Sequence, residues 1–205
     1  MLREAFINIF SKYTEDINYI NGEWNFVFTQ YNSKKRHYHN LGHLTSIYLI
    51  LNEIKDEIKN WDAVLFCLFY HDIIYKVSKN NNEEKSAELA KNVLDLVKAP
   101  TATIELVYDM IIATKGHLVS PQKDINYFTD ADLSILGKPR EEYIAYMNNV
   151  RKEYKMYPNF MYNKGRIKVL ESFLDMDRIY KTSFFHKSFE AQAKDNLAFE
   201  IKELS

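Results

Sequence analysis

Three of the chain's six histidines lie within eight residues, in the stretch RHYHNLGH at 36–43. Imidazole binds transition metals and exchanges a proton near neutral pH, so this cluster indicates metal binding or acid–base chemistry. His43 also begins an apolar stripe that continues at Ile47, Leu51 and Ile54, which is the spacing of one helix face. Because such a stripe packs against the core, we expect His43 to point inward.

A second polar feature interrupts the most apolar stretch of the chain. Residues 63–75 read AVLFCLFYHDIIY, so His71 and Asp72 have apolar residues on both sides. A buried carboxylate is costly unless a cation or several donors compensate its charge. A structural Asp–His pair, a helix-end hydrogen bond or a metal ion would each meet that need.

A third feature, TDADLSILG at 129–137, places Asp130 and Asp132 just ahead of an apolar turn. The three features fall on separate predicted helices, and packed helices can bring such side chains to one point. Two imidazoles and two carboxylates suit a divalent metal cation such as Mn, Fe, Mg, Co, Ni or Zn. Spacing alone leaves open whether the side chains meet and which aspartate takes part.

The elements that must position these residues are predicted to be helices. Only 5 Gly and 4 Pro occur in 205 residues, which favours long helices joined by short loops. A buried strand is the alternative for residues 62–75, but the sequence shows no partner strands. We therefore predict an all-α fold of about eight helices in a single domain over residues 1–205. The helical segments are expected at 6–17, 44–58, 62–75, 82–97, 100–116, 130–136, from 139 to 154, and near 162–181 and 186–203.

The composition excludes several classes of protein. Basic and acidic residues nearly balance, at 27 and 28, so no nucleic-acid surface is evident. Cys67 is the only cysteine, which excludes an internal disulfide and suits a small core residue. The N-terminal segment lacks the features of a signal peptide, and the longest apolar run, 63–70, is too short for a membrane span. We expect a cytoplasmic protein with no membrane partner; the oligomeric state is left open.

The ordered set His43, His71–Asp72 and Asp132 resembles the motif of the HD superfamily of metal-dependent phosphohydrolases. That motif is a histidine, an adjacent His-Asp pair and a distant aspartate, all on helices. The resemblance implies an HD-type helical bundle in which these four residues bind a divalent metal. In that pattern the last ligand follows a small residue, as Asp132 follows Ala131. Asp130 would then cap a helix, although it remains the alternative ligand.

The segment YHNLGH at 38–43 is similar to the YHNxxH segment of cyclic nucleotide phosphodiesterases. In those enzymes the later histidine binds metal and the earlier one protonates the leaving oxygen, which implies these roles for His43 and His39. This chain is shorter than their catalytic domains, and HDIIY lacks their second histidine, so cyclic nucleotides are not implied. The whole pattern is also similar to small bacterial predicted HD phosphohydrolases, a group without a settled substrate.

The reaction implied by the resemblance is hydrolysis of a phosphate ester, a monoester or a diester, of a nucleotide or another small molecule. A metal-activated water would attack phosphorus, with Asp72 orienting that water. His39 would contact the substrate and protonate the leaving oxygen. Arg36 is either ordinary surface charge or a clamp for the phosphate, since a guanidinium matches its oxygens in a bidentate way.

Two further residues have both a functional and a structural interpretation. Glu83 either contacts the metal water or is a favourable carboxylate in a first helical turn. His117 either binds a second metal or ends a helix, and we favour the helix end.

Two other functions fit the same residues. An HD-fold di-iron oxygenase needs extra histidines between the His-Asp pair and the last aspartate, where this chain offers only His117. It would consume dioxygen with ferrous iron and release no phosphate. A non-catalytic nucleotide-sensing module would bind nucleotide without turnover and would be favoured by degraded ligand positions, but all four are present.

Overall fold

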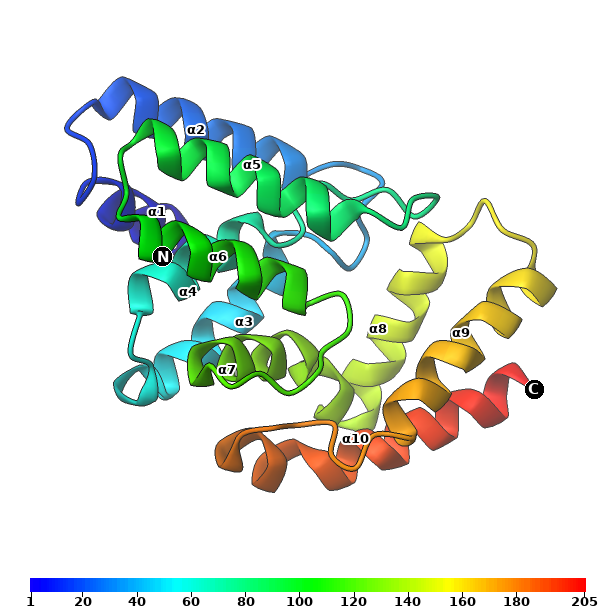
Figure 1. The fold of residues 1–205 in the computed structure, drawn as a ribbon. Helices are drawn as coiled ribbons and strands as arrows, with labels where there is room; N and C mark the ends of the chain where they lie inside the picture. The colour runs from blue at the N-terminus through cyan, green and yellow to red at the C-terminus, as the bar shows by residue number, and fades with distance from the viewer. The chain divides into compact units, whose positions relative to one another are not determined.

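A computed structural model describes residues 1–205 and contains helices but no strands (Figure 1). The all-α prediction is confirmed. The number of helices is higher than predicted, with ten α-helices and two 3-10 helices in place of about eight. Residue contacts group into two compact units, Met1–Thr129 and Asp130–Ser205. The single domain over 1–205 remains a prediction.

The first unit is built around one fully buried helix. Every residue of α4 from Ala63 to Tyr70 is buried, and α4 packs against α1, α3, α5 and α6. An apolar side chain buried in this way stabilises a fold by about 1.5–3 kcal/mol, so α4 is the main hydrophobic element of the unit. The helices are α1 (Leu2–Phe10), α2 (Ile17–Tyr31), α3 (Leu41–Glu53), η1 (Lys55–Glu57), α4 (Trp61–Tyr70), α5 (Asn82–Leu96), α6 (Thr101–Ala113) and most of α7 (Lys123–Asp132).

The helix predicted over 6–17 ends early, and a polar side chain begins a separate helix at residue 17. Periodicity predicted a continuous helix over 6–17, but α1 ends at Phe10. The Asp16 carboxylate accepts hydrogen bonds from the amides of Asn18 and Tyr19, each at 3.0 Å. These bonds satisfy amide groups that a helix start leaves open, so Asp16 begins α2 as its N-cap. The helix predicted over 44–58 is also shorter, since α3 ends at Glu53 and is followed by η1.

The second unit contains η2 (Leu133–Gly137), α8 (Arg140–Glu153), α9 (Asn159–Leu174) and α10 (Ser183–Leu204). α10 packs against η2, α8 and α9. The contact with η2 requires a glycine, because a Cβ at Gly137 would lie 2.7 Å from the carbonyl oxygen of Phe189. Asn196 of α10 closes the same contact by donating to the carbonyls of Leu136 and Lys138, each at 2.8 Å.

Residues 179–182, which we call the strap, are the last part of the connection from α9 to α10. Glu190 accepts hydrogen bonds from the amides of Ile179 and Tyr180, at 3.2 and 3.1 Å. Asp130 accepts from the amides of Lys181 and Thr182, at 3.0 and 2.8 Å. Four consecutive amides are therefore satisfied by two carboxylates rather than by a helix, so the strap is not helical, although the predicted helix ran to residue 181; α9 ends at Leu174.

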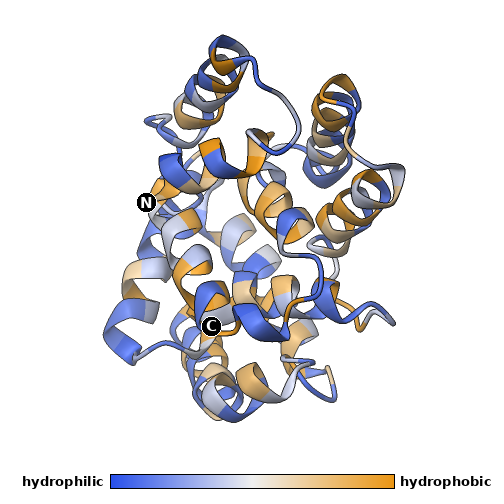
Figure 2. Ribbon diagram, turned by 90° about the vertical axis from the view of Figure 1, so that its left-hand side faces the viewer, coloured by the Kyte–Doolittle hydropathy of each residue, from blue (hydrophilic) through white to orange (hydrophobic).

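The helices are two-sided in hydropathy, with hydrophobic and hydrophilic residues on the same helix (Figure 2). This is the pattern of helices that bury one face against a core. None of the helices combines the length and apolar character needed to cross a lipid bilayer.

Candidate metal centre

The orientation of His71 follows from the way α4 ends. The His71 amide completes the helix by donating to the Cys67 carbonyl at 2.8 Å. The next amide, that of Asp72, donates instead to the Tyr31 hydroxyl at 3.2 Å. The Leu68 carbonyl lies 3.1 Å from Nδ1 of the His71 ring.

This contact determines which ring nitrogen of His71 can bind a metal. A carbonyl oxygen only accepts hydrogen bonds, so Nδ1 must carry the hydrogen. The neutral ring then has its lone pair on Nε2. A backbone carbonyl that holds the other nitrogen in this way is a common feature of metal-binding histidines. The His71 side chain is only 1% exposed, which adds steric restraint to the hydrogen bond.

Arg36 holds the segment after His71 in a non-helical conformation. Its Nη1 donates to the Asp72 carbonyl at 2.7 Å and to the His39 carbonyl at 3.2 Å, and Nη2 donates to the Ile73 carbonyl at 2.9 Å. Its guanidinium carbon lies 4.7 Å from the centroid of the Tyr31 ring. Arg36 was predicted as surface charge or as a phosphate clamp, but it is buried and binds three carbonyls. Its role is structural, and it joins the His39 and Asp72 segments.

Ser86 of α5 fixes the same segment from another side. Its buried hydroxyl accepts from the Ile74 amide at 3.1 Å and donates to the Ile74 carbonyl at 3.4 Å. The helix predicted over 62–75 therefore ends at Tyr70, because side chains from other helices satisfy the backbone beyond it.

His43 is positioned by the start of α3. The Asn40 side chain accepts from the Gly42 amide at 2.8 Å, which caps the helix. A Cβ at Gly42 would lie 2.9 Å from the Asn40 Oδ1, so this tight cap favours glycine. His43 follows one residue later and is buried, as predicted. Its ring centroid lies 5.6 Å from that of His71.

Asp132 is the last residue of α7, a helix that is tied to α4 at its other end. The Asp124 carboxylate accepts from the amides of Lys59 and Asn60 at 3.0 and 2.7 Å, just before α4 begins. One turn before Asp132, the Phe128 ring packs on His71 with centroids 5.4 Å apart.

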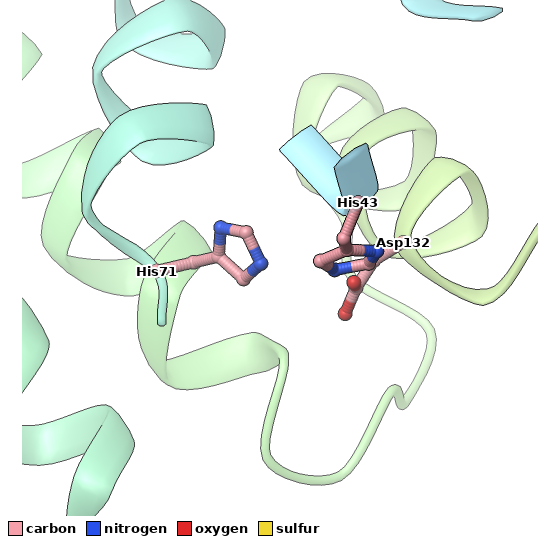
Figure 3. Close-up of side chains that lie close together, drawn as sticks. All are labelled: His43, His71 and Asp132. Carbon is pink, nitrogen blue, oxygen red and sulfur yellow. The ribbon is translucent and has the colours of Figure 1, made fainter. Parts of the chain in front are cut away.

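His43, His71 and Asp132 each offer a ligand atom, and these atoms all lie within 4.8 Å of one another. Figure 3 shows the two imidazoles and the carboxylate turned toward one another. Ligands about 2.1 Å from a metal ion are at most about 4.2 Å apart, so a small closure of the side chains would complete such a set. Two imidazoles with one carboxylate suit a divalent transition metal.

Asp72, the fourth predicted ligand, is not part of this group of three. Its Oδ2 lies 3.4 Å from Nε2 of His71, on the side of the ring that faces the group. Burial is the largest single effect and raises the pKa of the Asp72 carboxyl. When His71, His39 and His43 are protonated, their charges and the hydrogen bond from His71 together outweigh burial and hold the pKa well below its usual range. Asp72 is therefore an ionised carboxylate beside the cluster.

His39 lies just before α3, and Asn40 is the residue that caps this helix. The His39 ring centroid lies 4.3 Å from that of Tyr75 and 4.9 Å from that of Tyr38. It also lies 5.8 Å from the His43 centroid, so His39 borders the cluster.

Asp130, the alternative ligand, has a different role. Its carboxylate is fully buried and accepts from the strap amides and from the Thr182 hydroxyl at 2.8 Å. It neither joins the group of three nor caps the helix that follows it. The preference for Asp132 over Asp130 agrees with this arrangement.

Glu83 and His117 lie outside the group of three. Glu83 is in the first turn of α5, where its neighbour Glu84 pairs with Lys115. His117 has a positive φ of 49° just after α6, and its amide donates to the Ala113 carbonyl at 2.9 Å. This is the left-handed conformation that ends many helices, so the helix-end interpretation agrees with the structure, one residue after Gly116.

Sequence reasoning missed Tyr31 and Ser86, which hold the backbone around Asp72 from α2 and α5. It also gave no role to Tyr38 and Tyr75, which are partly exposed and contact His39. No linear pattern marks these four residues, because each acts across the fold.

Comparisons with protein-family models, with curated proteins and with solved structures found no match for this chain.

Proposed function

We propose that the protein is a metal-dependent phosphohydrolase that cleaves a phosphate ester of a small molecule by attack of water. The observation that supports this best is the group His43, His71 and Asp132, with the ring of His71 held so that Nε2 faces the group. These residues would hold a divalent cation. Such a cation supplies Lewis-acid chemistry, lowering the pKa of water and polarising a phosphoryl oxygen.

Asp72 would orient the attacking water. Its carboxylate stays ionised at neutral pH, because its pKa is held well below the usual range. A carboxylate with so low a pKa is a weak base, so it accepts a hydrogen bond and fixes the direction of the water without keeping a proton.

His39 would donate the proton that the leaving oxygen needs. Its ring contacts the rings of Tyr75 and Tyr38, and its backbone carbonyl accepts a hydrogen bond from Arg36. A proton donor held in this way loses little entropy when the substrate binds, which favours the reaction. The phosphorus–oxygen bond to the leaving group breaks as the bond to water forms, and the proton from His39 neutralises the leaving alkoxide. The proton that the attacking water loses passes to solvent, from which His39 is protonated again.

The test is a phosphate-release screen on the purified protein with Mn, Mg, Co or Ni, using nucleotides and general phosphoesters. We expect metal-dependent release with at least one class, and a loss of about a hundredfold or more in His39→Ala, because general acid catalysis contributes about 10²–10⁴-fold. A His37→Ala variant is the matched control, since His37 is a neighbouring histidine outside the cluster.

Two results would favour one of the two alternative functions over hydrolysis. Dioxygen uptake with ferrous iron and no phosphate release would favour the oxygenase. Tight nucleotide binding with no turnover under any of the metals would favour the sensing module.

A further inference from the structure

The bend that joins α8 to α9 and the first half of α9 form a strongly basic stretch of the second unit (Figure 1). Residues 151–168, RKEYKMYPNFMYNKGRIK, contain six basic residues and one acidic residue, Glu153. Glu153 is buried, so the exposed charge of this stretch is positive. Because the whole chain has 27 basic and 28 acidic residues, the rest of it is net acidic. Positive charge is therefore gathered at one place on the second unit.

Three large apolar side chains of the same stretch are exposed. Met156 in the bend is 63% exposed, and Phe160 and Met161 in the first turn of α9 are 75% and 50% exposed. Single exposed apolar residues are common on protein surfaces, but three within six residues form a local patch. We call these three residues the apolar tip.

Arg151 of α8 holds the bend in one conformation. Its Nη1 donates to the Tyr154 carbonyl at 2.9 Å. Its Nη2 donates to the Tyr157 carbonyl at 3.0 Å and to the Asn159 side chain at 2.7 Å. The guanidinium carbon also lies 4.7 Å from the centroid of the Tyr162 ring. The apolar tip is thus carried on an ordered backbone, which lowers the entropy that a binding event would cost.

Lysines extend the positive charge along an uncovered face of α9. Lys164 and Lys168 follow Phe160 at intervals of four residues, which places the three side chains on one face of the helix. Both lysines are exposed, as is Lys155 in the bend, and we call these three the outer lysines. A Cβ at Gly165, next to Lys164, would meet no atom within 4 Å. Nothing in the chain therefore covers this face.

The other side of α9 is covered by α10. Arg166 donates to Glu200 through Nε at 2.8 Å, and Asn163 donates to the Leu204 carbonyl at 3.0 Å. The charge of Arg166 is therefore compensated inside the fold. The outer lysines form no ion pair within the chain, so their charge is directed to solvent.

We propose that the apolar tip and the outer lysines dock on the surface of a membrane that contains anionic lipids. The lysines would be attracted to the headgroups, and the tip would enter the boundary between headgroups and acyl chains. A contact of this kind needs no membrane span, so the expectation of no membrane partner, which was drawn from the lack of a span, did not address it. The inference is independent of the proposed function, because it uses no residue of the candidate metal centre.

The residue types favour lipid over the other partners that positive charge attracts. The bases of a nucleic acid stack on aromatic rings, whereas two of the three residues of the apolar tip are methionines. A stable protein interface buries about 800 Å² on each partner, which is more than a tip of three side chains supplies. Flexible methionines and lysine point charges suit a fluid boundary that imposes no fixed geometry.

The test is co-sedimentation of the full chain with phosphatidylcholine vesicles containing about 30% phosphatidylserine, beside vesicles of phosphatidylcholine alone. We expect binding to the anionic vesicles that weakens as salt is added, and binding to the neutral vesicles that is about tenfold weaker or worse. The double variant Lys164→Gln and Lys168→Gln should bind anionic vesicles about tenfold more weakly or worse, since each lysine near such a surface contributes about fivefold. Phe160→Gln should weaken binding by about tenfold, because an apolar insertion is lost.

Two control variants make the same chemical changes on α5. The double variant Lys85→Gln and Lys91→Gln removes two exposed lysines and gives the same net charge as the α9 double variant. Leu96→Gln replaces an apolar side chain that is 68% exposed. Both controls should bind the anionic vesicles as wild type does. Since every substituted side chain is exposed, all variants should unfold at the wild-type urea concentration.

Equal binding of wild type to the two kinds of vesicle, or binding to neither, would overturn the inference, and so would an equal loss in the α9 variants and the α5 controls. Binding of a mixed-sequence single-stranded RNA, weakened in Phe160→Gln and without vesicle binding, would identify a nucleic-acid surface instead. A wild-type dimer that becomes a monomer in Phe160→Gln, again without vesicle binding, would identify an interface between two copies of the chain.

Discussion

Nδ1 of His71 lies 3.1 Å from the carbonyl oxygen of Leu68, and this contact turns Nε2 of the same ring toward His43 and Asp132. The contact forms where α4 ends, because the Asp72 amide bonds the Tyr31 hydroxyl rather than continuing the helix. The hydrogen bonds that end α4 therefore also orient the His71 ring within the candidate metal centre. The substitutions below separate the residues that hold the backbone from those that would hold the metal.

Tyr31→Phe should destabilise the fold by about 1–3 kcal/mol, because it leaves the Asp72 amide without its hydroxyl acceptor in a buried position. Urea unfolding measures the loss, and amide hydrogen exchange should show faster exchange at Asp72. Tyr48→Phe removes a hydroxyl from a partly exposed tyrosine and serves as the control. Unchanged exchange at Asp72 in Tyr31→Phe would contradict the role given to Tyr31.

Arg36→Met should lower the free energy of unfolding by about 2–4 kcal/mol, since the buried guanidinium binds three carbonyls that would lose their donors. Lys35→Met changes the adjacent exposed residue and should stay within about 0.5 kcal/mol of wild type. The structural role would be contradicted if both variants unfold at the wild-type urea concentration while Arg36→Met loses phosphate binding. Arg36 would then be the phosphate clamp that the sequence suggested.

Asp130→Asn should mainly reduce stability, whereas Asp132→Asn should mainly reduce metal affinity. Asp130 accepts from the strap amides and the Thr182 hydroxyl, so its loss should cost about 2–3 kcal/mol of stability and leave metal affinity nearly unchanged. Asp132→Asn should reduce metal affinity strongly and change stability little. Urea unfolding and metal titration of the two variants check both halves. A reversed pattern would identify Asp130 as the ligand.

The stability of the strap should depend on pH through Glu190. Burial raises the pKa of this carboxyl, but hydrogen bonds from the Tyr180 and Ile179 amides and the nearby Lys194 outweigh it, so the folded-state pKa is below its ordinary value of 4.5. His186 faces the same carboxylate at 3.5 Å. A lowered folded-state pKa contributes stability that is present above pH 4.5 and is lost as pH falls through the folded-state value.

Glu190→Gln removes this contribution. Wild type should therefore be more stable than the variant in urea near pH 6, and the difference should shrink steadily as the pH falls below 4.5. A difference that is constant from pH 3 to pH 7 would show that the ionised form of Glu190 contributes nothing.

Several parts of the fold and the site were predictable because they depend on residues near in sequence. The helical class follows from apolar periodicity, and the inward position of His43 follows from its place on the stripe with Ile47 and Leu51. The buried position of His71 follows from the apolar residues around it. Each of these properties is local, so the order of residue types is enough to indicate it.

Other features depended on partners that no local pattern reveals. The end of α4 is set by Tyr31, Arg36 and Ser86, which are 12 to 41 residues away in the chain. Arg36 has the residue type of a phosphate clamp, but its contacts with backbone carbonyls appear only in the fold. The convergence of His43, His71 and Asp132 likewise required the packing of three helices.

The most direct test of the account is metal titration of the purified protein, beside His71→Ala, His43→Ala and the control His186→Ala. We predict one divalent ion per wild-type chain, a loss of affinity of about a hundredfold or more in the first two variants, and wild-type affinity in the control. Equal metal binding by wild type and His71→Ala would contradict the proposed metal centre.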